Sequence, residues 1–245
     1  MIFEPSGTLL VVHWSHSSAA NRHHYDGWQV AGVTATEIVC PQATVIERCE
    51  MARIRGVPAR DAGLWVRLVY YFTRRHLARL SGRPRTTIEP IMMFAHLPGL
   101  LLAYAGLEQA TAKLHGLEQR HRALVELKTA TLTQCEWCID LGSQVARRWG
   151  LSDEALLALP SYCTSALFSD VDKLVLDYAV AMSRTPVQVS DALFAQLRNH
   201  FDDAQLVELT YLIALENLRG RFNLTLGIGE AGFSEGRVCA VPATA

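Results

Sequence analysis

Beyond residue 60 the sequence is a succession of helix patterns, and the alternation of apolar and polar residues that marks a strand is absent there. Several patterns begin at a side chain that can cap a helix: Ser152, Ser169, Ser190, and Asp202 or Asp203. Pro98 fits the first turn of a helix, and Pro186 ends another. The sequence therefore predicts an all-α fold of about eight helices. The ranges expected are residues 61–80, 98–114, 118–132, the stretch after Cys135 that Gly150 closes, 152–160, 169–183, 190–200 and 202–220.

Composition argues against several classes of protein. The chain has 245 residues, of which 50% are hydrophobic, and its formal net charge is −1. A nucleic-acid-binding surface would need a basic excess, and a membrane-spanning helix would need an apolar run of about 18 residues. The sequence has neither, and its N-terminus lacks the pattern of a secretory signal. Its six cysteines do not form the spacing of a secreted disulfide framework, which predicts a reduced, cytoplasmic compartment.

Residues 1–50 differ in composition from the rest and are expected to form an irregular, dispensable N-terminal extension to a helical domain of residues 51–245. Four histidines gather in this stretch, which leaves a metal-binding tract as an alternative: His13, His16, His23 and His24. We favour the extension, because the sequence from Met51 onward opens like an ordinary domain.

Two cysteines three positions apart, Cys135 and Cys138, are expected at a helix–helix junction, near the N-terminus of the second helix. Unpaired backbone N–H groups and the positive end of the helix dipole favour a thiolate there. Cys135 is predicted to be the more exposed, reactive thiol, and Cys138 the thiol that resolves it. A buried, inert pair is the alternative. A structural zinc site would need four ligands, and no second cysteine or histidine pair with matching spacing is available.

Polar residues elsewhere supply further candidates for the site. Glu216 can pair with Arg219 or Arg221 in the last helix, and Arg221 or Asn223 can line a pocket beside the thiols. His96 precedes the helix of Pro98 and is either a structural histidine or a site residue. A basic amphipathic helix such as 61–80 can bind a membrane surface, but we expect this one to dock on its own domain or on a second subunit.

Residues of roughly 60–240 resemble the carboxymuconolactone decarboxylase-like superfamily, in its AhpD-like alkylhydroperoxidase branch. The resemblance rests on four blocks: LVELKTA from Leu124, CEWCIDLGS from Cys135, LVLDYAVAMSRTP from Leu174, and ALENLRGRFN from Ala214 with LGI from Leu226. It implies an AhpD-like helical domain that assembles as a homo-oligomer, a trimer or a hexamer. It also implies a peroxidase-like activity in which Cys135 and Cys138 reduce a hydroperoxide or a peroxiredoxin-like partner, and a dithiol reductant restores them. No cofactor and no metal are implied.

Two positions depart from the branch. Its relay glutamate, twelve residues before the first cysteine, is here Ala123, and its relay histidine, four residues after the second, is here Gly142. Glu126 is the candidate base in place of this relay. Gly142 is expected to leave space beside Cys138, whereas Asp140 lies about 200° around the helix and points away from that thiol. With His96, Arg221 and Asn223, the candidate pocket residues are Asp140, Gly142 and Ser143.

The function predicted is a CxxC-dependent, peroxidase-like thiol oxidoreductase. Two alternatives stay open. One is a lyase of the carboxymuconolactone decarboxylase type that acts on a small acid from aromatic catabolism, with the cysteines incidental. The other is a helical oligomer without turnover that senses redox state through its cysteine pair.

Overall fold

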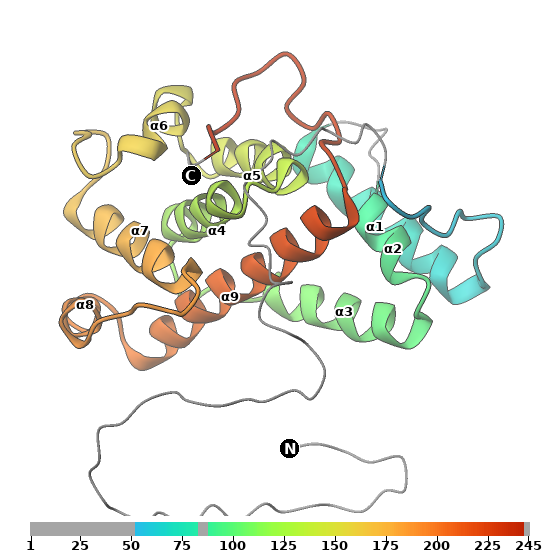
Figure 1. The fold of residues 1–245 in the computed structure, drawn as a ribbon, viewed down its shortest axis with the longest axis horizontal. Helices are drawn as coiled ribbons and strands as arrows, with labels where there is room; N and C mark the ends of the chain where they lie inside the picture. Colours follow the sequence, from blue (N-terminus) through green and yellow to red (C-terminus); the bar gives the residue numbers. More distant parts are fainter. Residues whose placement is uncertain (1–51, 83–87, 243–245) are drawn as a thin grey trace, which may run out of the picture. The chain divides into compact units, whose positions relative to one another are not determined.

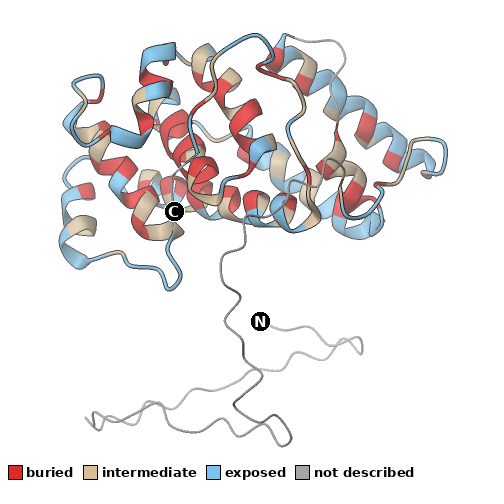
Figure 2. Cartoon of the chain, turned by 45° about the horizontal axis from the view of Figure 1, so that its top comes forward, coloured by how far each residue is buried: buried red, intermediate tan, exposed pale blue. Residues whose placement is uncertain are grey.

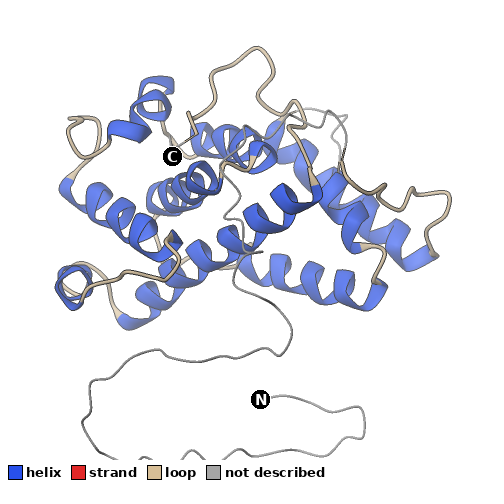
Figure 3. Cartoon of the chain, viewed as in Figure 1, coloured by secondary structure: helices blue, strands red, loops and turns tan. Residues whose placement is uncertain are grey.

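A computed structural model describes residues 52–82 and 88–242. In this part of the chain every regular element is a helix and no strand occurs, which confirms the all-α prediction (Figures 1 and 3). The elements are α1 (Leu64–Ser81), α2 (Glu89–Phe94), α3 (Pro98–Thr111), α4 (Gln119–Thr133), α5 (Glu136–Arg148), α6 (Asp153–Ala158), the short 3₁₀ helix η1 (Leu159–Ser161), α7 (Asp170–Ser183), α8 (Asp191–Leu197) and α9 (Asp203–Leu226). The proposed extension 1–50 and its histidines lie outside the described residues, so the domain boundary stays a prediction.

The predicted capping residues begin the helices as expected. The side chains of Ser152, Ser169, Ser190 and Asp202 each accept a backbone N–H from the first turn that follows. Ser169 forms a full capping box with the third residue of α7, and Asp202 does the same in α9. These local bonds satisfy N–H groups that a helix leaves unpaired, which is why the sequence alone located these helix starts.

Helix α4 is the centre of the fold and packs against α5, α7 and α9 (Figure 1). Nine of its residues are buried, on all sides of the helix (Figure 2). A helix that is covered all round belongs to the interior of a domain. Because α5 follows α4 directly and α9 lies along it, the cysteines at the start of α5 are held in this interior.

Three helix ends differ from the expected ones. Helix α3 ends at Thr111, α8 ends at Leu197, and α9 continues past Gly220 to Leu226, where Gly227 adopts a left-handed conformation (φ 69°) and ends it. Gly220 therefore lies inside α9 and does not end it. At this position α9 comes close to Thr133 of α4. Helix α2 was not predicted, because six residues are too few for a periodic pattern.

Helix α1 buries a different side from the one that its aromatic residues suggest. Val66, Tyr70 and Leu77 face the interior, whereas Trp65 and Phe72 are 72% and 63% exposed. The aromatic side of α1 is therefore not docked on its own domain in this part of the chain. None of the described helices is both long and apolar enough to cross a bilayer.

Candidate functional site

Cys135 and Cys138 form a disulfide at the junction of α4 and α5. Gln134 has a positive φ (57°) and ends α4, so that the chain turns and Cys135 becomes the N-cap of α5. The Cys138 N–H donates to Cys135 Sγ at 3.3 Å. The predicted location at the start of the second helix is therefore observed, and the CxxC spacing places both sulfurs on the first turn of α5.

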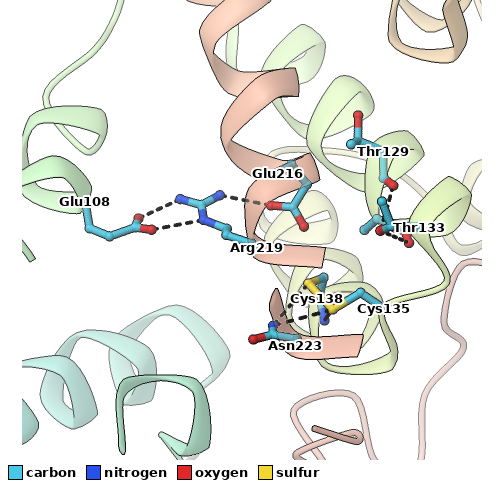
Figure 4. The surroundings of a disulfide bond; sticks show 9 residues. Glu108, Thr129, Thr133, Cys135, Cys138, Glu216, Arg219 and Asn223 are labelled. Carbon is cyan, nitrogen blue, oxygen red and sulfur yellow. Dashed lines mark hydrogen bonds and ion pairs between the residues drawn. A yellow bond between two sulfur atoms is a disulfide. The ribbon is translucent and has the colours of Figure 1, made fainter. Parts of the chain in front are cut away.

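A side-chain amide from α9 contacts both sulfurs. Asn223 Nδ2 lies 3.5 Å from Cys135 Sγ and 3.5 Å from Cys138 Sγ (Figure 4). Asn223 is only 2% exposed, so this donor sits in the interior and has lost its contact with water. Of the six candidate pocket residues, Asn223 is the one that the structure places against the thiols.

Both cysteines are buried, and the predicted order of exposure is wrong. Cys135 is 1% exposed and Cys138 is 5% exposed. The N-cap position explains this order, because Cys135 lies beneath the end of α4 and its N–H donates to the Ala130 carbonyl at 3.2 Å. Cys138 lies one turn further along α5 and is the residue with the larger exposed fraction.

Arg219 lies on α9, the helix that also carries Asn223, and three glutamates surround its guanidinium. We call this group the acid cluster and define it as Glu108, Glu126, Glu216 and Arg219. Arg219 binds both carboxylate oxygens of Glu108, at 3.0 Å and 2.6 Å, and donates to Glu216 at 2.9 Å. Its guanidinium also lies 3.7 Å from Glu126. The predicted ion pair of Glu216 is thus confirmed with Arg219. Arg221, the alternative partner, is exposed and donates to Thr185 instead.

Burial and charge shift the protonation of this cluster. Burial raises the pKa of Glu216 to about 7, with the nearby Glu126 and Glu108 carboxylates adding to the shift and Arg219 opposing it. Burial raises the pKa of Glu126 as well, against the attraction of Arg219 and Arg122. Three carboxylates surround one guanidinium, so the cluster holds a proton more readily than isolated glutamates do.

Asp140 and Ser143 bind the C-terminal segment and not a substrate. The Asp140 carboxylate accepts the backbone N–H groups of Ala231, Phe233 and Ser234 at 2.6–3.0 Å. Ser143 Oγ accepts the N–H of Ala240 at 3.0 Å. Both side chains are buried, and their hydrogen bonds attach residues 231–240 to α5, which corrects their assignment to the pocket. The hydrogen bonds of the Asp140 carboxylate go to this segment.

Gly142 and His96 also differ from expectation. A Cβ at Gly142 would meet Leu127 Cδ1 at 3.2 Å, so the expected space beside Cys138 is filled by a leucine from α4. His96 is exposed, and its Nε2 lies 2.9 Å from the Arg55 carbonyl, which supports a structural role for this histidine. Glu108 was missed altogether, because it lies 111 residues before Arg219 and no local pattern links them.

Two further features of the described residues concern metal binding and a surface depression. Within residues 52–82 and 88–242 no three His, Cys, Asp or Glu side chains are grouped to hold a metal ion, so a zinc site has no ligand set there. A depression in the surface is lined by residues of α7 and the end of α8, including Lys173, Asp177 and His200, and by none of the candidate residues.

Comparison with known proteins agrees with this geometry. The model of the carboxymuconolactone decarboxylase family matches residues 98–181, which contain α3, α4, the cysteine pair and most of α7. This part of the chain is therefore similar to the carboxymuconolactone decarboxylase family.

Two curated relatives and two solved structures show what the chain is similar to. YnjA of Escherichia coli is 45% identical over 122 residues, which span 49% of this chain and 64% of YnjA, less than two thirds of that relative. YdfG of Bacillus subtilis is 24% identical over 116 residues, 47% of this chain and 79% of YdfG. The AhpD-core, peroxidase-related protein of Ralstonia eutropha has a TM-score of 0.60 at 20% identity, over 77% of this chain and 97% of that one. The debrominase Bmp8 has a TM-score of 0.60 at 18% identity, over 71% and 89%. The two structural similarities show that the chain has the AhpD-like helical fold.

Proposed function

We propose that the protein is a CxxC-dependent thiol oxidoreductase of the peroxidase type. It reduces an organic hydroperoxide, or a peroxiredoxin-like partner, through a dithiol/disulfide cycle of Cys135 and Cys138, and a dithiol reductant restores the thiols. The observation that carries this proposal is the buried amide of Asn223, 3.5 Å from both sulfurs of a disulfide at a helix N-terminus.

Opening a disulfide places negative charge on the sulfur that leaves. Cys135 Sγ has two donors aimed at it, the Cys138 N–H and the Asn223 amide, whereas Cys138 Sγ has the amide alone. Donors that are already in place stabilise such charge without reorganisation. Cys135 is therefore the better leaving group, and the more exposed Cys138 is the sulfur that an incoming thiolate attacks.

The cycle balances with one dithiol and one hydroperoxide. A donor thiolate attacks Cys138, the S–S bond breaks, and Cys135 leaves as a thiolate. The second donor thiol then attacks the mixed disulfide and releases Cys138 as a thiolate. Cys138 takes the terminal oxygen of the hydroperoxide and becomes a sulfenic acid, while the alcohol leaves with a proton. Cys135 condenses with that sulfenic acid, water leaves, and the disulfide re-forms.

Glu126, the predicted base, contributes through the acid cluster. Its carboxylate faces Arg219, and no hydrogen bond joins it to either sulfur among the described residues. The cluster takes the place of the proton relay of the AhpD-like branch, whose glutamate and histidine positions are Ala123 and Gly142 in this chain. The assembly as a trimer or hexamer and the cytoplasmic setting belong to the same proposal, and the exposed aromatic side of α1 is available for a subunit contact.

One observation favours a second candidate, a redox sensor without turnover. Both sulfurs are at most 5% exposed, and a sensor needs only slow access by an oxidant.

The test measures consumption of cumene hydroperoxide with dihydrolipoamide as the donor. We expect turnover of the hydroperoxide in the wild type and its loss in Cys135→Ser and Cys138→Ser. Cys163→Ser is the matched control, because Cys163 is a free and exposed cysteine. Turnover that survives in the Cys135→Ser, Cys138→Ser double variant would exclude the proposal. A disulfide that the donor reduces without any turnover would support the sensor.

A further inference from the structure

A polar seam runs between α4 and α9, which are also joined by the ion pair of Arg122 and Glu208. We define the seam as Glu126, Thr129 and Thr133 on α4, and Glu216, Gly220 and Asn223 on α9. In each helix, neighbouring members of the seam are three or four positions apart, and the first and last members are seven positions apart. The three residues of each helix therefore share one face. A Cβ at Gly220 would lie 2.3 Å from Thr133 Oγ1, which shows how closely the two faces approach.

The seam has the disulfide at one end and the acid cluster at the other. Figure 4 shows Glu216 and Asn223 projecting from α9, with Thr129 and Thr133 on the helix beside them. Asn223 contacts both sulfurs, and Glu216 lies two helical turns before it on the same face. Glu216 is 5% exposed and is therefore closed off from bulk water, as the sulfurs are.

A hydroxyl within the seam has no partner. Thr129 is 0% exposed, and its Oγ1 makes no hydrogen bond with the described residues. The Thr133 hydroxyl donates to the carbonyls of Thr129 and Ala130, which leaves its lone pairs free to accept. Buried hydroxyls are normally satisfied, so the Thr129 hydroxyl is available for a hydrogen bond within the seam.

The ionisable groups that act on the members of the acid cluster come from three helices. Tyr104 and Glu108 belong to α3, Arg122 and Glu126 to α4, and Arg219 to α9 itself. Arg122 is held elsewhere by the carbonyls of Leu114 and Thr111, so Arg219 is the cation that contacts the three carboxylates. Three acids against one such cation leave a proton to share within this cluster.

We propose that Glu216 is the internal proton donor of the disulfide cycle and delivers its proton along the seam to the sulfur that leaves. This inference rests on the thiol–disulfide chemistry proposed above. When the donor thiolate attacks Cys138 and the S–S bond breaks, the Glu216 carboxyl protonates the Cys135 thiolate and becomes a carboxylate. The second donor thiol returns a proton to Glu216 as it attacks the mixed disulfide. The Cys135 proton leaves in the water that forms when the disulfide closes.

The test follows reduction of the disulfide alone, without peroxide. The oxidised protein is mixed with dihydrolipoamide between pH 5.5 and 8.5, reaction is stopped by alkylation, and the rate is divided by the concentration of donor thiolate. We expect this normalised rate to fall as pH rises, with a midpoint near 7, because the carboxyl loses its proton there. In Glu216→Gln the rate becomes independent of pH and, at pH 6, falls by about 10²-fold, the lower end of the range for general acid catalysis.

Two further glutamate variants serve as a second test and as a control. In Glu108→Gln the fast rate at low pH remains and the midpoint moves to lower pH, because a carboxylate that raises the pKa of Glu216 is gone. Glu118→Gln, at an exposed position before α4, behaves as the wild type. A Glu216→Gln profile that matches the wild type would overturn the inference. A pH-independent rate in the wild type would also overturn the inference, and that measurement does not depend on whether any variant folds. Peroxide turnover together with such a rate would leave the proposed function standing and remove only the role of Glu216.

Discussion

Burial of Glu216 has a consequence for stability that is measurable without any substrate. Its pKa is about 7 in the folded protein, against 4.5 for a free side chain. Between these two values the folded state holds a proton that the unfolded state has released. Stability therefore falls as pH rises through this interval. At 1.36 kcal/mol per pKa unit, the full difference amounts to roughly 3 kcal/mol by pH 8.

Urea denaturation followed by far-UV circular dichroism, at intervals from pH 5 to pH 8, measures this loss. We expect the free energy of unfolding of the wild type to fall by about 2–3 kcal/mol across the range, and that of Glu216→Gln to fall much less. The difference between the two proteins isolates Glu216 from groups that titrate identically in both, and Glu118→Gln controls for removal of a glutamate as such. A difference between wild type and Glu216→Gln that stays constant from pH 5 to pH 8 would refute the reasoning, because it would mean that Glu216 titrates alike in the folded and unfolded states.

Three further predictions concern contacts around the disulfide. Gly220→Ala forces α9 away from Thr133 and should lower the free energy of unfolding by about 1–3 kcal/mol. Adding Thr133→Ala should recover part of this loss, and urea titration of the single and double variants measures whether it does. Asp140→Ala removes the acceptor of three backbone N–H groups and should lower the free energy of unfolding by about 3 kcal/mol or more. Amide exchange at residues 231–234 should become faster, and unchanged exchange there would contradict the attachment of this segment to α5. Asn223→Ala removes a donor to both sulfurs, and the rate of disulfide reduction should fall about tenfold; an equal rate would show that the amide does not stabilise the leaving sulfur.

The sequence identified those features whose cause is local. Helix starts at Ser169 and Asp202 depend on a side chain and the N–H groups three residues later, and the structure reproduces both. The cysteine junction follows from two adjoining helix patterns. The pair Glu216–Arg219 follows from spacing on one helix.

Features that depend on distant contacts could not be found in this way. Periodicity predicted that Asp140 points away from Cys138, but not that residues 231–234, an irregular segment, would supply its partners. The filled space at Gly142 depends on Leu127 of another helix. The aromatic side of α1 was a reasonable candidate for the core, yet Val66 and Tyr70 are buried in its place, because side choice is decided by what α1 packs against.

The attachment of residues 231–240 to α5 also bears on how the protein is made. Ala231 follows Asp140 by 91 residues, so a growing chain contains both cysteines long before the partners of their helix are synthesised. Until then, the Asp140 carboxylate on the cysteine helix has no backbone N–H groups to accept. The environment of the two sulfurs is thus completed only after residues 231–240 have been synthesised, and oxidation before that point would act on a helix that still lacks this segment.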